Sequence, residues 1–175
     1  NSLSERNMDT LSSVYGNVYR LVEIIHEVTK DSPLKMAVEN KKVLLKPNWV
    51  SHSLNPEDEF CLRTNDNFVL AVLNTVLRMG PSGVIVGDAP IQGCRWDRMI
   101  TESFITGVKA LSAEFNVPVT IRDFRRRTYV FAENRAISDV RPLSEYVIFD
   151  LGMNSFLEPI TSESKTGFRV TNYNP

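Results

Sequence analysis

Apolar residues follow two different spacings along the chain, one typical of strands and one typical of helices. Short apolar runs predict three buried strands, at residues 43–45, 84–87 and 117–121. Between these runs, apolar residues at steps of three and four predict amphipathic helices over residues 65–79 and 100–115. The predicted order of elements is therefore strand, helix, strand, helix, strand.

That order predicts an α/β fold, because right-handed crossovers join parallel strands through helices. We expect a mostly parallel sheet with helices on both faces, a Rossmann-like three-layer arrangement, in which residues 43–45 form a central strand. Residues 127–137 alternate weakly around Glu133-Asn134-Arg135, which allows an added β-hairpin in the C-terminal part. Residues 146–150 predict a further strand.

Two details of the helices can also be predicted. An amphipathic stripe predicts a helix over residues 10–29, capped by Asp9 or Thr10. Its repeat is shorter than the three or four heptads of a coiled coil, so we expect this helix to dock on its own domain. Gly107 lies inside the predicted helix at 100–115 and could kink or split it.

Composition favours one globular domain, since the chain has 175 residues of which 42% are hydrophobic. We expect a core over residues 10–150 and an irregular tail over residues 151–175, with residues 1–175 forming the N-terminal part of a longer protein. Lys and Arg total 20 against 21 Asp and Glu, so the charge does not favour nucleic acid as a partner. No run approaches the ~20 apolar residues of a membrane span, and the polar first residues lack a signal-peptide core. We therefore expect a cytoplasmic protein without a membrane partner.

Cysteine usage is typical of a reducing compartment. The chain has 2 cysteines, Cys61 and Cys94, and neither belongs to a C-x-x-C motif, so no metal site is predicted. Iron–sulfur clusters normally take four thiolates, so this chain alone cannot ligate one and its cofactor stays unassigned. The sequence also lacks the G-x-G-x-x-G, G-x-x-x-x-G-K-[ST] and G-x-S-x-G motifs of dinucleotide, P-loop and serine-hydrolase sites.

Polar residues gather where two of the predicted strands end. Lys46 and Asn48 follow the run at 43–45, and Asp88 follows the run at 84–87. Ligands of open α/β sheets bind outside the carboxyl ends of the strands, so we expect these side chains to converge on one crevice. The lysine supplies positive charge, the asparagine a donor and an acceptor, and the aspartate can orient a hydroxyl, hold a cation or act as a base. The predicted ligand is an anionic or phosphorylated small molecule.

Two further residues are candidate ligand contacts. Thr64 begins the helix predicted over 65–79, and His52 lies in the loop that follows Asn48, as the only histidine near the predicted crevice. A helix cap explains Thr64 more simply than ligand binding does. His52 is retained as an acid/base or ligand residue.

Simpler structural roles exist for the other candidates as well. Lys46 can be a solvated residue at a strand end, Asp88 can cap a turn, and Asn48 can adopt left-handed geometry. Cys94 is interpreted as a packing residue. We interpret the run at 125–127, which is Arg125-Arg126-Arg127, as solvated charge that guards a sheet edge, with phosphate or partner binding as the alternative.

Two of these strand ends carry a family resemblance. Residues 43–50 read Val-Leu-Leu-Lys-Pro-Asn-Trp-Val, and residues 84–90 read Val-Ile-Val-Gly-Asp-Ala-Pro. With the Thr64-Asn65 helix start, they resemble the N-terminal part of the family catalogued as domain of unknown function 362, which has a "[IL]KPN" and a "VGD[SA]P" strand end. The resemblance covers roughly residues 41–150. The motif positions that it carries over are Lys46, Pro47, Asn48, Asp88 and Pro90.

The resemblance implies a prokaryotic, cytoplasmic α/β protein of a family whose members are sometimes fused or linked to ferredoxin-like iron–sulfur modules and are taken to be redox-related, with no settled reaction. The family continues into a Lys/His-containing segment that this chain lacks. We therefore expect a domain that binds an anionic molecule within an iron–sulfur-linked oxidoreductase. The alternative is a non-catalytic binding or assembly module that contacts a partner protein or an acidic polymer through the helix at 10–29 and the run at 125–127. Two further candidate partners are its own missing C-terminal part and a second copy of the chain. Whether the chain is itself an enzyme is left open.

Overall fold

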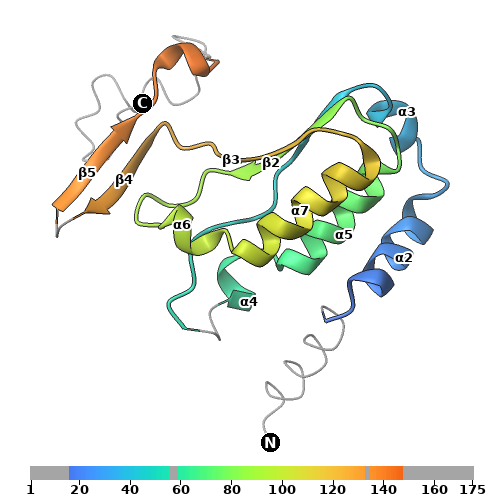
Figure 1. The fold of residues 1–175 in the computed structure, drawn as a ribbon, viewed down its shortest axis with the longest axis horizontal. Coiled ribbons are helices and arrows are strands. Elements are labelled where there is room, and N and C mark those ends of the chain that lie inside the picture. The colour runs from blue at the N-terminus through green and yellow to red at the C-terminus, as the bar shows by residue number, and fades with distance from the viewer. Residues whose placement is uncertain (1–15, 56–58, 133–134, 148–175) are drawn as a thin grey trace, which may run out of the picture. The chain divides into compact units, whose positions relative to one another are not determined.

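The structure is a computed structural model that describes residues 16–55, 59–132 and 135–147 (Figure 1). By its internal contacts the chain divides into two units, Asn1–Val140 and Arg141–Pro175. In the second unit the described residues form a short 3-10 helix, η2 (Leu143–Glu145). The predicted tail at 151–175 and most of the strand predicted over 146–150 lie outside the described residues.

The first unit contains a parallel sheet of three strands, β1 (Lys42–Leu45), β2 (Gly83–Asp88) and β3 (Val119–Asp123), in the order β1-β2-β3. Two helices connect them, α5 (Asp66–Leu77) after β1 and α7 (Glu102–Phe115) after β2. The predicted α/β class and the parallel pairing are confirmed.

Helices α5 and α7 pack together on one face of the sheet (Figure 1). Leu73 of α5, Phe104 of α7 and Val86 of β2 belong to one buried core. Two right-handed crossovers that advance in the same direction along a sheet place their helices on the same side. On the opposite face Leu44 remains 58% exposed and Thr120 is also exposed. The described residues therefore do not confirm the expected three-layer arrangement.

The position of β1 differs from the prediction. Among the described residues β1 pairs only with β2, so it is an edge strand and not a central one. Its residues alternate between exposed and half-buried, with Val43 and Leu45 against the core and Leu44 facing outward. A run of three apolar residues cannot distinguish a central strand from an edge strand, because the outward residue of an edge strand can be apolar too.

Polar caps delimit the two connecting helices. The Asn65 side chain accepts a hydrogen bond from Asn67 N at the start of α5, and Thr101 accepts one from Phe104 N at the start of α7. The expectation that Gly107 would kink or split its helix is wrong, since α7 runs through it without a break. A Cβ atom at this position would lie 2.8 Å from Leu70 Cδ1, so the glycine allows α5 and α7 to approach closely.

Helix α2 (Val18–Thr29) packs on α5 and buries Leu21 there, which confirms that this helix docks on its own domain. Asn17 is extended and accepts a hydrogen bond from Arg20 N at 3.1 Å. The expectation of one continuous helix over residues 10–29 is therefore wrong at Asn17, because the chain is not helical there. The caps proposed at Asp9 or Thr10 lie outside the described residues.

Several short elements complete the described chain. They are α3 (Leu34–Val38), α4 (Glu59–Leu62) and α6 (Trp96–Met99). Strands β4 (Arg127–Ala132) and β5 (Arg135–Val140) pair antiparallel in a two-stranded sheet of their own. Among the helices that the structure describes, none is both long and apolar enough to cross a membrane.

Candidate functional site

Lys46 and Asp88 meet at the carboxyl edge of the sheet. Lys46 follows β1 directly and Asp88 is the last residue of β2, and these strands are parallel neighbours. Lys46 Nζ lies 2.8 Å from Asp88 Oδ1. The lysine side chain is 60% exposed whereas the aspartate is buried, so the ion pair joins a solvent-facing cation to an internal carboxylate.

Two backbone N–H groups also donate to the Asp88 carboxylate. Its Oδ2 accepts a hydrogen bond from Trp49 N at 2.8 Å, and its Oδ1 accepts one from Ala89 N at 2.7 Å. Burial raises the pKa of Asp88, but the hydrogen bonds from Lys46, Trp49 and Ala89 outweigh burial and hold that pKa below its usual value. The carboxylate is therefore ionised at neutral pH, and its position suits holding Lys46 and the turn at 46–49 better than removing a proton from a substrate.

The turn after β1 is joined to the start of α5 through Asn48 and Thr64. Asn48 N donates to Thr64 Oγ1 at 3.0 Å, and Thr64 N donates to Asn48 O at 3.0 Å. Thr64 does not cap α5, because Asn65 does so. Asn48 is not left-handed either, since the described non-glycine residues with positive φ are Asn40 and Asn116. These contacts place the two chain segments side by side and leave the Asn48 side chain exposed.

A pocket of about 300 Å³ opens between β1 and α5 beside this turn. Its lining combines polar residues of the turn with apolar residues of both elements: Leu44, Leu45, Lys46, Pro47, Asn48, Thr64, Phe68, Val69 and Val72. The volume is at the lower end of the range for small-molecule sites. The structure thus brings Lys46, Asn48 and Thr64 to one pocket, with Asp88 behind Lys46.

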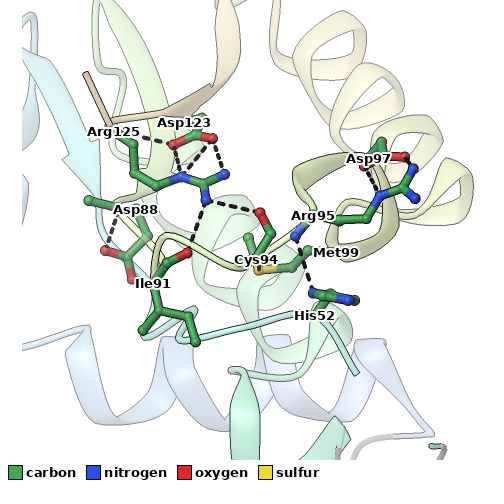
Figure 2. Close-up of polar contacts among 10 residues, drawn as sticks. His52, Asp88, Ile91, Cys94, Arg95, Asp97, Met99, Asp123 and Arg125 are labelled. Atoms are coloured by element: carbon green, nitrogen blue, oxygen red, sulfur yellow. Dashed lines mark hydrogen bonds and ion pairs between the residues drawn. The ribbon is translucent and has the colours of Figure 1, made fainter. Parts of the chain in front are cut away.

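His52 is not among the residues that line this pocket. Its Nδ1 atom accepts a hydrogen bond from Arg95 N at 3.1 Å (Figure 2). With Nδ1 used as an acceptor, a neutral His52 carries its proton on Nε2. Its contact holds the loop before α6 and does not support a role at the Lys46 pocket.

Arg125 has a structural position that differs from the prediction. The run at 125–127 was expected to be solvated, yet Arg125 is only 5% exposed and its Nη2 lies 2.6 Å from Asp123 Oδ2. Its Nη1 also donates to the carbonyl oxygens of Ile91, at 3.0 Å, and of Cys94, at 2.9 Å (Figure 2). The expectation is wrong for this residue because the buried Asp123 and two loop carbonyls need the guanidinium donors.

Cys94 packs in the core, as predicted. It is buried, and its Sγ lies 3.8 Å from Met99 Sδ (Figure 2). Burial raises the pKa of the Cys94 thiol, and the backbone N–H of His52 and the charge of Arg125 only partly offset this effect. The thiol is therefore protonated and unreactive at neutral pH.

The cysteines do not fit an iron–sulfur cluster. Cys61 is exposed and Cys94 is buried, and such clusters normally take four thiolates. Within the described ranges, no group of three or more His, Cys, Asp or Glu side chains is placed to hold a metal ion.

Sequence reasoning missed the apolar wall of the pocket, which consists of Leu45 of β1 and the α5 residues Phe68, Val69 and Val72. The sequence alone does not identify these residues as a pocket wall. The partial exposure of Leu45, Phe68 and Val72 follows only once β1 is placed at the edge of the sheet. No protein-family model, curated protein or solved structure matches the chain, so the geometry of this pocket carries the functional proposal.

Proposed function

We propose that this domain binds a small anionic molecule in the pocket between β1 and α5, at the carboxyl end of the parallel sheet. One observation carries the proposal: Lys46, Asn48 and Thr64, which the sequence pattern singles out, line the same pocket. Carboxyl ends of parallel strands are the usual binding edge of α/β sheets.

Each residue has a distinct part in the proposed site. Lys46 supplies the positive charge, and Asn48 supplies an exposed carboxamide beside it. Asp88 is a positioning residue that fixes the ammonium group, and Thr64 holds the turn through its contact with Asn48. The apolar residues of α5 give the ligand a surface on which to bury its non-polar part.

An iron–sulfur-linked oxidoreductase is the wider activity that the family resemblance implies. We propose it only in the sense that the redox centre is held by residues that are not part of this sequence, because both cysteines of the chain lie in its described part. Anaerobic purification of the complete open reading frame, with analysis of bound iron and sulfide, tests that part separately from ligand binding.

Anion binding can be tested by comparing Lys46→Met with Lys42→Met. Both lysines are exposed and close to β1, but Lys42 does not line the pocket. We expect a panel of small carboxylates and phosphate esters to contain ligands that raise the melting temperature of the wild type and of Lys42→Met, but not of Lys46→Met. An equal response of the two variants would contradict the site, and no response in any protein would contradict the function.

The alternative function, an assembly module, is supported by one feature of α2. Ile24 is 47% exposed and Val28 is 74% exposed, and these residues lie one helical turn apart. In this alternative a second copy of the chain covers them, while Arg125 contributes nothing because it is buried. Light scattering of the wild type and of Val28→Glu distinguishes the cases, since a dimer that dissociates in the variant favours assembly.

A further inference from the structure

The pocket between β1 and α5 has a polar end and an apolar end. Asn48 and Thr64 are hydrogen-bonded where β1 finishes and α5 begins, so the polar lining lies at the carboxyl edge. Val72 lies on α5 about 1.7 turns after the helix begins at Asp66, and Leu45 of β1 directly precedes Lys46. Helix α5 runs back along β1, so the apolar lining extends away from the polar end.

The polar end offers one positive charge and few donors. Lys46 has three N–H donors, of which one is directed at Asp88. The Thr64 hydroxyl accepts a hydrogen bond from Asn48 N and directs its own proton to Asn48 O at 3.4 Å, which leaves the Asn48 carboxamide as the other side chain able to donate to a ligand there. Because the Asp88 carboxylate lies 2.8 Å from Lys46 Nζ, part of the lysine charge is already compensated.

The start of α5 does not provide a phosphate site. Helix N-termini attract phosphate through free backbone N–H groups and the helix dipole. Here the Asn65 side chain accepts from Asn67 N, and Asp66 places a carboxylate in the first turn, where it bonds Arg63 and Thr101. A phosphate dianion would therefore meet one lysine whose charge Asp88 already partly compensates, beside the start of α5, where the Asp66 carboxylate is itself paired with Arg63. These charges suit a monoanion better than a dianion.

The volume of the pocket limits the size of its ligand. Liquid water occupies roughly 30 Å³ per molecule, so about 300 Å³ accommodates about ten non-hydrogen atoms. A linear carboxylate of about eight carbons matches that size and also matches the change from polar to apolar lining.

We infer that the ligand of this pocket is a monocarboxylate with an unbranched apolar body, and not a phosphate ester. The inference rests on the proposed function and specifies the ligand class of the same site. The carboxylate binds Lys46 and Asn48, and the hydrocarbon lies between Leu45 and the α5 residues Phe68 and Val72.

The test uses the 175-residue chain with octanoate, hexanoate, butyrate, octanol and octyl phosphate at neutral pH. Amide shifts of Thr64 and Val72 in heteronuclear NMR locate each probe, and titrations give its affinity. We expect octanoate to shift both amides and to bind at least tenfold more tightly than octanol or octyl phosphate. Since a buried methylene contributes about 0.8 kcal/mol, or about fourfold in affinity, each pair of buried carbons removed should weaken binding by about sixteenfold.

Lys46→Met should weaken octanoate binding at least tenfold and leave octanol binding unchanged, whereas Lys42→Met should change neither. Octyl phosphate that binds this pocket more tightly than octanoate would overturn the ligand class and leave the proposed function intact. Octanol that binds as tightly as octanoate would overturn carboxylate recognition. If no anion shifts Thr64 or Val72, the proposed function fails as well. The comparison among probes uses the wild type alone, so it does not depend on the folding of a variant.

Discussion

The backbone N–H of Trp49 donates a 2.8 Å hydrogen bond to the carboxylate of Asp88, 39 residues later in the chain. The same carboxylate binds Lys46, so one buried side chain at the end of β2 fixes both ends of the turn that follows β1. The geometry of the candidate site therefore depends on a residue that does not line its pocket.

Asp88→Asn should destabilise the protein by about 2–4 kcal/mol at pH 7, because the amide cannot replace every acceptor and the lysine loses its partner. The folded state lowers the pKa of Asp88, so the contribution of its charge is complete above the usual value of 3.8 and is lost as the pH falls through the folded-state pKa. The difference in the free energy of unfolding between the wild type and the variant should accordingly shrink below about pH 4. Urea unfolding at several pH values measures it.

The control for this experiment is Asp97→Asn. Asp97, like Asp88, is ion-paired, and its partner is Arg95. This pair lies at the surface, so the free energy of unfolding should change little. A difference for Asp88→Asn that stayed constant down to pH 2.5, or grew in acid, would contradict the role assigned to its charge.

Arg125→Met should lower the free energy of unfolding by about 3–5 kcal/mol, because it leaves the buried Asp123 carboxylate without its cation and two carbonyls without a donor. Arg127→Met is the matched control two residues later, exposed at the start of β4, and should change stability by less than about 0.5 kcal/mol. Equal effects of the two substitutions in chemical denaturation would show that Arg125 does not hold the loop that contains Ile91 and Cys94.

Gly87→Ala should be strongly destabilising, by about 3 kcal/mol or more, because its Cβ would collide with the backbone carbonyl oxygen of Arg122 in β3. Gly93→Ala should be neutral or slightly stabilising, since nothing lies within 4 Å of a Cβ at that position. Thermal unfolding of both variants tests the close approach of β2 and β3. A stable Gly87→Ala protein would show that these strands are farther apart.

One thiol should react with a disulfide reagent in the native protein and two after denaturation. Cys61 is exposed, whereas burial raises the pKa of Cys94 and shields it from the reagent. Cys61→Ser should therefore remove the native-state reaction and leave the reaction in denaturant. Rapid modification of Cys94 in the folded Cys61→Ser protein would contradict its burial.

Periodicity predicted the three parallel strands and the two connecting helices because each buries a regular stripe or run of apolar residues. Periodicity did not reveal that β1 is an edge strand. Val43, Leu44 and Leu45 are all apolar, although only the first and third face the core. The number of neighbours of a strand depends on the rest of the sheet and not on its own residues.

The polar part of the candidate site followed from its position after two strands, whereas Arg125 did not. A run of arginines is usually solvated, and nothing local indicated that Asp123 and the carbonyls of Ile91 and Cys94 would surround the first of them. Asn17 is a similar case, since the apolar stripe continues across it while its side chain begins α2. In both cases one hydrogen-bonding group overrides the average preference of its segment.

The two tryptophans of the chain, Trp49 and Trp96, lie with ring centroids 5.9 Å apart and ring planes at 71°. Both indoles lie close to the turn that Asp88 holds, so intrinsic fluorescence is a local reporter of that turn. At this separation the indoles should also couple excitonically and give a paired band in the circular dichroism spectrum. Loss of that band before loss of the helical signal would reveal a partly unfolded state in which the pocket between β1 and α5 opens while α5 and α7 persist.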